Sequence, residues 1–112
     1  MKLSIGVDLH KRQFTCYFLP EKGSGFFQQI PANNKGYEEF IKILRGSKDV
    51  GVSEVEIAVE STGNTRYFKN RLEKEGFPVK VVNSMKFKII NESTNKTDKR
   101  DAKTLAEFLQ KD

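Results

Sequence analysis

The sequence has little of what would anchor a protein in a membrane or cross-link it covalently. Cys16 is the only cysteine, so neither an internal disulfide nor a cysteine metal cage can form. No stretch of about 18 apolar residues is present, which excludes a membrane-spanning helix. Asp8 interrupts the short apolar stretch at the N-terminus too early for a secretory signal. We therefore expect a cytoplasmic protein without a membrane partner, in which Cys16 is a small buried residue.

The chain is basic and has the size of one domain. Its 112 residues include 20 Lys and Arg against 15 Asp and Glu, which gives a net charge of +5. A basic balance favours a polyanionic partner such as DNA. The cations gather between residues 80 and 103, either as a solvated helical face or as a phosphate-binding surface. The residues that we expect to contact phosphates are Lys86, Lys88, Lys96, Lys99 and Arg100.

Short apolar and β-branched runs predict five strands, at residues 3–8, 13–19, 26–30, 54–60 and 78–82. The first three are joined by short links, which is typical of an antiparallel meander. In the fourth, Val55, Ile57 and Val59 lie on one face. The fourth and fifth strands each follow a helix, so we expect them to join the first strand in parallel. The order predicts an α/β fold with a five-stranded mixed sheet, the first strand central and the fourth beside it.

Helical spacing of apolar residues predicts the helices between these strands. The first should start at Asn33 or Asn34 and be followed by a loop at residues 46–53. The second should be capped by Ser61 or Thr62 and end at Gly76. The apolar stripe expected on the first helix is Tyr37, Phe40, Ile41 and Leu44, and the second helix carries the apolar residues Tyr67, Phe68 and Leu72.

The C-terminal third predicts two further helices. Residues 84–92 are expected to form a short basic helix, and the polar residues 92–96 to be mobile. Thr97 should cap a last helix, which carries Asp98 and Asp101 in its first turn. The apolar stripe expected on that helix is Leu105, Phe108 and Leu109.

Four acidic residues from three distant segments could converge in this topology. Asp8 and Glu60 end the first and fourth strands. If these strands are parallel neighbours, both carboxylates emerge at the edge where open α/β sheets bind their ligands. Asp98 and Asp101 are three residues apart and therefore share one face of a helix.

Such a cluster suits metal-assisted phosphoryl transfer. Mg²⁺ and Mn²⁺ prefer oxygen ligands, and two ions about 4 Å apart can clamp the attacking and leaving oxygens. We expect two ions, with Asp8 as the bridging ligand because the central strand holds its backbone most rigidly. Each acid also has a simpler explanation. Asp8 could only end a strand, Glu60 could face solvent, and Asp98 and Asp101 could complement a helix dipole.

Four segments carry a resemblance that covers nearly the whole chain. They are IGVDLHK at residues 5–11, AVESTGN at 58–64, VVNSMKFK at 81–88 and NKTDKRDAKTLAEFL at 95–109. In order and spacing they resemble the N-terminal domain of the DEDD transposases of bacterial insertion sequences, a family that includes the Piv-type DNA invertases. The resemblance implies a ribonuclease-H-like, RuvC-like domain in which Asp8, Glu60, Asp98 and Asp101 bind divalent metal and catalyse DNA cleavage and strand transfer.

The resemblance also implies partners and a further domain. Members of the family are described as using a structured guide RNA and as carrying a C-terminal domain with a nucleophilic serine. Nothing in residues 1–112 matches that second domain, so we expect an isolated catalytic domain that lacks full recombinase activity. We expect the full-length protein to form a homo-oligomer.

Three other functions remain open on the sequence. An actin-like or sugar-kinase-like nucleotide-binding module also opens with a strand, an Asp and a hairpin. However, its hairpin usually has Gly just after the Asp, where this chain has Leu9, His10 and Lys11. A Holliday-junction nuclease of the same fold would use nearly identical chemistry. A non-catalytic nucleic-acid-binding domain would bind without metal.

Overall fold

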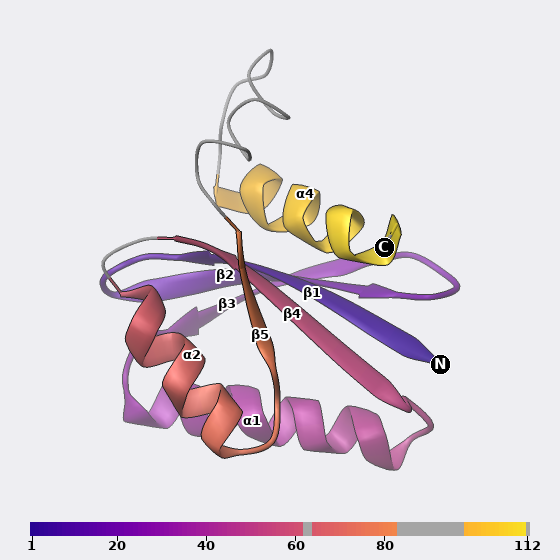
Figure 1. Cartoon of the computed structure of the whole chain (residues 1–112), viewed down its shortest axis with the longest axis horizontal. Helices are drawn as coiled ribbons and strands as arrows, with labels where there is room; N and C mark the ends of the chain where they lie inside the picture. Colours follow the sequence, from indigo (N-terminus) through magenta and orange to yellow (C-terminus); the bar gives the residue numbers. More distant parts are fainter. Residues whose placement is uncertain (62–63, 83–97, 112) are drawn as a thin grey trace.

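The computed structural model describes residues 1–61, 64–82 and 98–111, with residues 98–101 described by their backbone only. The elements carry the labels of Figure 1. The strands are β1 (Lys2–Leu9), β2 (Gln13–Pro20), β3 (Phe26–Pro31), β4 (Glu54–Glu60) and β5 (Val79–Val82). The helices are α1 (Asn34–Asp49), α2 (Thr65–Lys74) and α4 (Asp98–Lys111). None of these helices is long and apolar enough to cross a membrane.

The strands form one mixed sheet in the order β3-β2-β1-β4-β5. The β1–β2 and β2–β3 pairs are antiparallel, and the β1–β4 and β4–β5 pairs are parallel. β1 is therefore the central strand with β4 beside it. The predicted α/β fold of the ribonuclease-H-like class, with its five-stranded mixed sheet, is confirmed.

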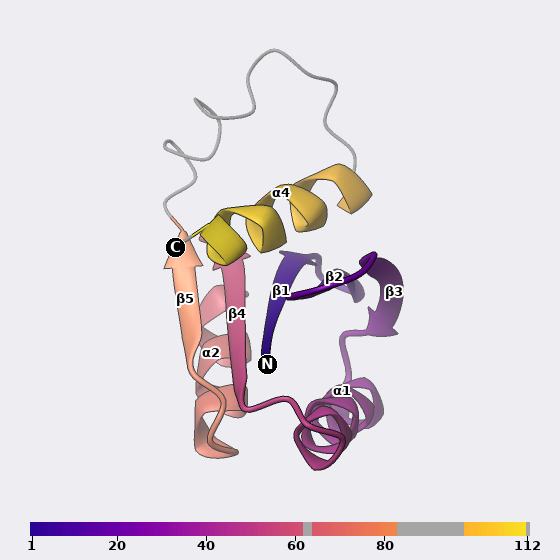
Figure 2. The same cartoon turned by 90° about the vertical axis from the view of Figure 1, so that its right-hand side faces the viewer.

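Helices cover both faces of the sheet. Figure 1 shows α1 and α2 below the strands and α4 above them, and Figure 2 shows α2 behind β4 and β5. The larger core lies on the α1 and α2 side, where Phe14 of β2 is the centre of an aromatic cluster. Its ring centroid lies 5.4 Å from those of Tyr37 and Phe40 and 5.5 Å from that of Phe68. These tilted and edge-on contacts join both helices to the sheet.

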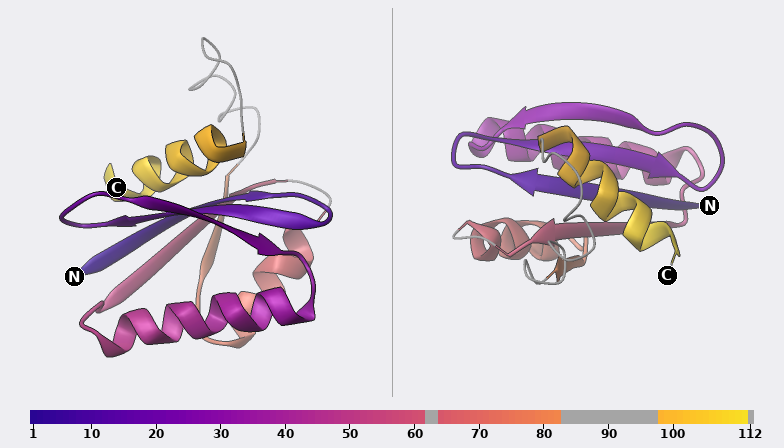
Figure 3. Two further views of the ribbon diagram at one scale, coloured as in Figure 1. Left: turned by 180° about the vertical axis from the view of Figure 1, so that it is seen from behind. Right: turned by 90° about the horizontal axis from the view of Figure 1, so that it is seen from above.

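A smaller apolar layer holds α4 on the opposite face. Leu105 and Leu109 pack against Ala58 of β4, and Ala102 and Ala106 pack against Tyr17 of β2. Figure 3 shows α4 lying diagonally across the strands. The helix therefore contacts β2, β1 and β4, and its position is set by the three central strands of the sheet.

α1 is longer than predicted. The expected loop is wrong for residues 46–49, because the helix continues to Asp49. A single exposed Gly46 costs a helix only about 1 kcal/mol, which the buried face of α1 offsets. Ser47 Oγ donates to the carbonyl of Ile43 at 3.1 Å within the helix. The chain turns away at Gly51, whose φ of +108° suits glycine.

α2 begins later than predicted. Ser61 is not its cap, because the Ser61 amide donates to the carbonyl of Val82 at 3.0 Å and continues the β4–β5 pairing. Thr62 lies outside the described residues. The helix starts at Thr65, whose Oγ1 donates to the carbonyl of Glu60 at 3.0 Å. This bond joins the start of α2 to the end of β4.

Two of the large apolar residues named on the predicted helices are exposed. Tyr67 of α2 is 55% exposed and Phe108, from the expected stripe of α4, is 37% exposed, whereas the other residues named there are buried. Three further expectations lie outside the described residues: the helix at 84–92, the mobile segment at 92–96 and the cap at Thr97. Cys16 is fully buried as expected, and burial raises the pKa of its thiol well above the usual value.

Candidate active site

Asp8 lies near the carboxyl end of β1, on the face of the sheet that α4 covers. Side chains alternate along a strand, so Asp8 shares a face with Gly6, which lies directly beneath α4. Asp8 is only 8% exposed. A carboxylate this deeply buried requires polar partners, and one of them is the imidazole of His10. His10 Nε2 lies 3.0 Å from Asp8 Oδ2.

Glu60 lies beside Asp8 on the neighbouring strand. β1 and β4 pair in parallel, and the register aligns Gly6 with Ala58 and Val7 with Val59. One position further along both strands, Asp8 is opposite Glu60. Because side chains alternate along a strand, Asp8 and Glu60 lie on the same face of the sheet as Ala58, which packs under α4. Neighbouring strands are about 4.8 Å apart, so the backbones of Asp8 and Glu60 lie side by side at the same edge of the sheet.

α4 runs in the opposite direction to β1, which directs its first turn toward Asp8. Its C-terminal end lies over the start of β1, because Lys2 Nζ donates to the carbonyl of Leu109 at 3.1 Å. Its middle lies over Gly6, which is close to backbone atoms of Ala102 and Ala106. The turn that precedes Ala102 therefore extends toward the half of β1 that ends in Asp8. This turn contains Asp98 and Asp101, whose side chains are outside the described part.

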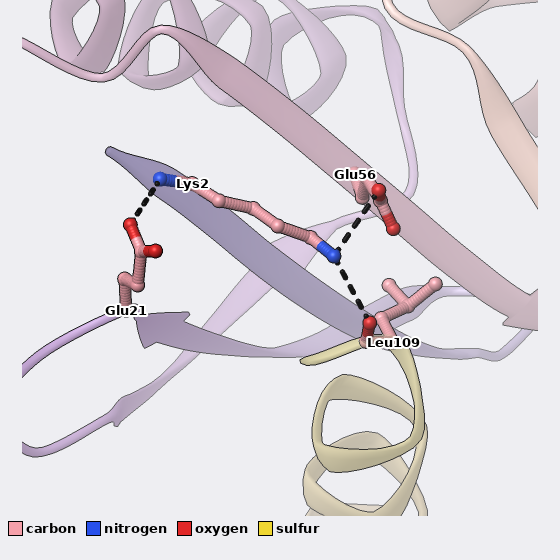
Figure 4. Close-up of polar contacts among 4 residues, drawn as sticks. All are labelled: Lys2, Glu21, Glu56 and Leu109. Atoms are coloured by element: carbon pink, nitrogen blue, oxygen red, sulfur yellow. Dashed lines mark hydrogen bonds and ion pairs between the residues drawn. The ribbon is translucent and has the colours of Figure 1, made fainter. Parts of the chain in front are cut away.

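Lys2 fixes the far end of α4. Figure 4 shows its ammonium group between Leu109 of α4 and Glu56 of β4. The ion pair to Glu56 Oε1 is 3.2 Å long, and the Lys2 amide donates to Glu21 Oε2 at 3.1 Å. A cation at the last carbonyls of a helix also interacts favourably with the helix dipole. Lys2 therefore holds the C-terminal end of α4 against the sheet, which helps to set the direction of the helix.

Two residues near Asp8 were missed by the sequence reasoning. His10 contacts Asp8, and the spacing of two residues along the end of a strand was the available signal. Thr15 is the cross-strand neighbour of Asp8 on β2 and is fully buried. Its Oγ1 has no hydrogen-bond partner among the residues that the structure describes. The register of the β1–β2 hairpin makes Thr15 the neighbour of Asp8. The sequence gives the length of the hairpin but not this register.

The structure places two of the four predicted acids at the ends of adjacent parallel strands. Among the side chains it describes, no group of three or more His, Cys, Asp or Glu is arranged to hold a metal ion. Asp8 and Glu60 nevertheless offer carboxylate oxygens on one face of the sheet, and oxygen is the donor that Mg²⁺ and Mn²⁺ prefer. The donor chemistry therefore fits a divalent cation, with further ligands required from outside these two strands.

The predicted phosphate contacts fall outside the region whose side chains are described. Lys86, Lys88 and Lys96 lie between β5 and α4, and Lys99 and Arg100 are placed only as backbone in the first turn of α4. Two other cations face the α4 side of the sheet. Lys103 Nζ lies 6.0 Å from the Tyr17 ring centroid, and Lys80 Nζ lies 5.6 Å from that of Phe108.

Solved structures of two enzymes resemble parts of this fold. A Ppx/GppA phosphatase from Aquifex aeolicus is 14% identical with a TM-score of 0.44, and the match covers 74% of this chain and 36% of that chain. A ROK hexokinase from Thermus thermophilus is 19% identical with a TM-score of 0.45, and the match covers 72% of this chain and 33% of that chain. The chain thus spans about a third of the length of these structures. No curated protein sequence gives a significant match.

A comparison of the sequence with protein-family models identifies the family. Residues 5–112 match the model of a family described as transposase, the DEDD transposases of IS110-type elements. The match includes β1 with Asp8, β4 with Glu60 and the whole described length of α4. The chain therefore belongs to the DEDD transposase family, whose members act on DNA during transposition.

Proposed function

We propose that this chain is the metal-dependent catalytic domain that cleaves and transfers DNA strands in an insertion-sequence transposase. The observation that carries the proposal is the position of Asp8 and Glu60 on adjacent parallel strands. Both carboxyl groups end neighbouring parallel strands and lie on the face that α4 covers. Family membership supplies the class of reaction, and this pair supplies a place where a divalent cation can bind.

Asp8 is proposed as the central ligand, and Asp98 and Asp101 as the residues that complete the site. β1 is hydrogen-bonded on both sides, so the backbone of Asp8 is fixed by two neighbouring strands. Glu60 is held at the end of β4, where Thr65 bonds its carbonyl. When bound, a pair of Mg²⁺ or Mn²⁺ ions would activate the attacking oxygen and neutralise charge on the leaving oxygen. His10 would orient the Asp8 carboxylate through their 3.0 Å contact.

The basic charge of the chain and its family membership support the proposed partners of the site. Lys86, Lys88, Lys96, Lys99 and Arg100 would bind DNA phosphates. Each neutralised phosphate should steepen the salt dependence of duplex binding by about 0.9 log unit per log unit of salt. A structured guide RNA, homo-oligomerisation and a C-terminal domain with a nucleophilic serine would belong to the full-length transposase.

Plasmid nicking tests the proposal directly. Supercoiled plasmid is incubated with Mn²⁺ and the transposase that carries this chain. We expect Asp8→Asn and Glu60→Gln each to lower the nicking rate by about a hundredfold or more, because each removes several kcal/mol of charge stabilisation. Glu54→Gln is the matched control, since Glu54 lies on the same strand and face as Glu60 but at the opposite, exposed end. Its activity should equal that of the wild type.

The same preparations separate the alternative functions. Preferential cleavage of a four-way DNA junction would favour a Holliday-junction nuclease. A thermal shift with ATP, and none with Mn²⁺ alone, would favour a nucleotide-binding module. Nucleic-acid binding that is unchanged by EDTA, together with nicking that survives Asp8→Asn, would contradict the catalytic proposal and favour a binding domain.

A further inference from the structure

A small pocket opens beside the carboxyl end of β1, on the side of α1 and α2. Its volume is about 120 Å³, and its walls come from the β1–β2 hairpin and from the starts of both helices. His10 and Lys11 line it from the hairpin, and Tyr37 and Tyr67 line it from the helices. Because His10 also contacts Asp8, this residue links the pocket to the candidate active site around the carboxyl end of β1.

Tyr67 presents a fixed aromatic ring at this pocket. The ring is 55% exposed and meets Tyr37 edge-on, with centroids 5.4 Å apart and an interplanar angle of 81°. The Tyr67 hydroxyl accepts a hydrogen bond from Arg71 Nη1 at 3.1 Å, and the same nitrogen donates to Asn34 Oδ1 at 2.8 Å. The ring is thus held by α1 and by its own helix. An aromatic ring that is both held and exposed is a ready platform for stacking.

The pocket floor is apolar and uncharged at neutral pH. Tyr37 is 3% exposed, and burial raises the pKa of its hydroxyl to about 12, with a further contribution from Tyr67 and an opposing one from Arg71. Leu9, which packs in the core, forms part of the wall. A flat, uncharged group such as a nucleobase therefore suits the interior better than a charged one.

Cations lie on and beside the pocket. Lys11 lines it, and Arg12 follows at the exposed tip of the hairpin. In α2, the helix that carries Tyr67, the cations outnumber the single acid, Glu73, by four to one, and they are Arg66, Lys69, Arg71 and Lys74. Cations beside an aromatic platform are the combination with which proteins hold single-stranded nucleic acid, since the cations follow the backbone and the ring takes a base.

We propose that this pocket binds one unstacked base of the nucleic-acid strand that enters the active site, with Tyr67 stacking on the base and Lys11 contacting an adjacent phosphate. The inference deepens the proposed function, because it assigns to the same site a preference for a locally single-stranded substrate. It uses residues of the hairpin, α1 and α2, none of which belongs to the proposed metal ligands.

Binding of a single-stranded DNA of about ten nucleotides tests the pocket, because single-strand binding sites span roughly 4–16 nucleotides. The DNA carries one 2-aminopurine, whose fluorescence falls when it stacks, and the chain contains no Trp to interfere. We expect Tyr67→Ala to weaken binding about tenfold and to abolish the quenching, since one stacked base is lost. Tyr67→Phe should retain both DNA binding and fluorescence quenching, because it keeps the aromatic ring. Lys11→Gln should lower the salt dependence by about one phosphate contact.

Phe26→Ala is the matched control. Phe26 is 54% exposed on the edge strand β3 and stacks on Phe18, so it is an equally accessible aromatic outside the pocket. The Phe26→Ala variant should bind the DNA as tightly as the wild type does. Absence of quenching by the wild type would overturn the inference, as would unchanged binding by Tyr67→Ala or an equal loss in Phe26→Ala.

Binding is measured in EDTA, which separates this inference from the proposed function. If Tyr67→Ala binds the DNA normally while Asp8→Asn loses its response to Mn²⁺, base binding in the pocket is refuted and the metal site is supported. If Tyr67→Ala loses DNA binding while Asp8→Asn responds to Mn²⁺ as the wild type does, base binding in the pocket is supported and the metal site is refuted.

Discussion

Replacing Gly6 by alanine tests whether α4 must lie directly on β1. A Cβ at this position would overlap the carbonyl oxygen of Ala102, and would approach the Ala106 nitrogen to 2.6 Å and the Leu105 Cβ to 2.9 Å. Two of these three atoms belong to the helix backbone, so no change of rotamer relieves the overlap. The whole helix must shift away from β1, because a packed interior has no free space to absorb the added group.

This displacement of α4 should destabilise the domain. Overpacking a tight contact costs about 1–3 kcal/mol. For a domain of about this size, each kcal/mol changes the melting temperature by about 4–8 °C. We therefore expect Gly6→Ala to melt roughly 5–20 °C below the wild type. Since α4 carries Asp98 and Asp101, its displacement should also reduce any stabilisation by Mn²⁺.

Gly46→Ala is the control, with the opposite expected sign. Gly46 lies in α1, and an added Cβ there meets nothing within 4 Å. Alanine is favoured over glycine inside a helix by roughly 0.5–1 kcal/mol, so this variant should melt above the wild type. Urea unfolding of the three proteins checks both signs. A Gly6→Ala protein as stable as the wild type would show that α4 does not depend on close approach to β1.

Three further predictions concern single side chains. Thr15→Val should stabilise the metal-free protein by about 1 kcal/mol in urea, because the buried Thr15 hydroxyl has no partner among the described residues; a loss of stability would show that this hydroxyl is bonded. Lys2→Met should destabilise the domain by about 1–2 kcal/mol through loss of its bond to the Leu109 carbonyl, and unchanged unfolding would refute that anchoring role. Burial raises the pKa of the Cys16 thiol, so above about pH 8.5 the unfolded chain releases a proton that the folded chain keeps. Stability should therefore fall as pH rises from there, and the pH profile of Cys16→Ala should fall less steeply.

The sheet could be predicted because its signals are local. Alternation of Val55, Ile57 and Val59 fixes the buried face of β4, and the strand and helix order then fixes its parallel position beside β1. The neighbouring positions of Asp8 and Glu60 follow from that arrangement, since both acids come at strand ends. These steps depend only on side-chain period and chain connectivity.

The remaining features depend on contacts that span the fold. The extension of α1 past Gly46 reflects packing of the whole helix, which outweighs a local glycine cost. Phe68 and Leu72 share one face of α2, but Tyr67 is one residue away, and its ring lies at the pocket beside Tyr37. The contact of Gly6 with α4 joins residues about a hundred positions apart, and no local pattern encodes that separation.

Asp8 is proposed as a principal metal ligand, and a melting curve with Mn²⁺ tests this role. An ion that binds only the folded state, at about 100 times its dissociation constant, stabilises that state by about 2.7 kcal/mol. The melting temperature of the wild type should then rise by roughly 10 °C or more. Asp8→Asn should lose most of this rise, while Glu54→Gln, at the far end of the neighbouring strand, should keep it. Equal rises in the wild type and in Asp8→Asn would contradict the account.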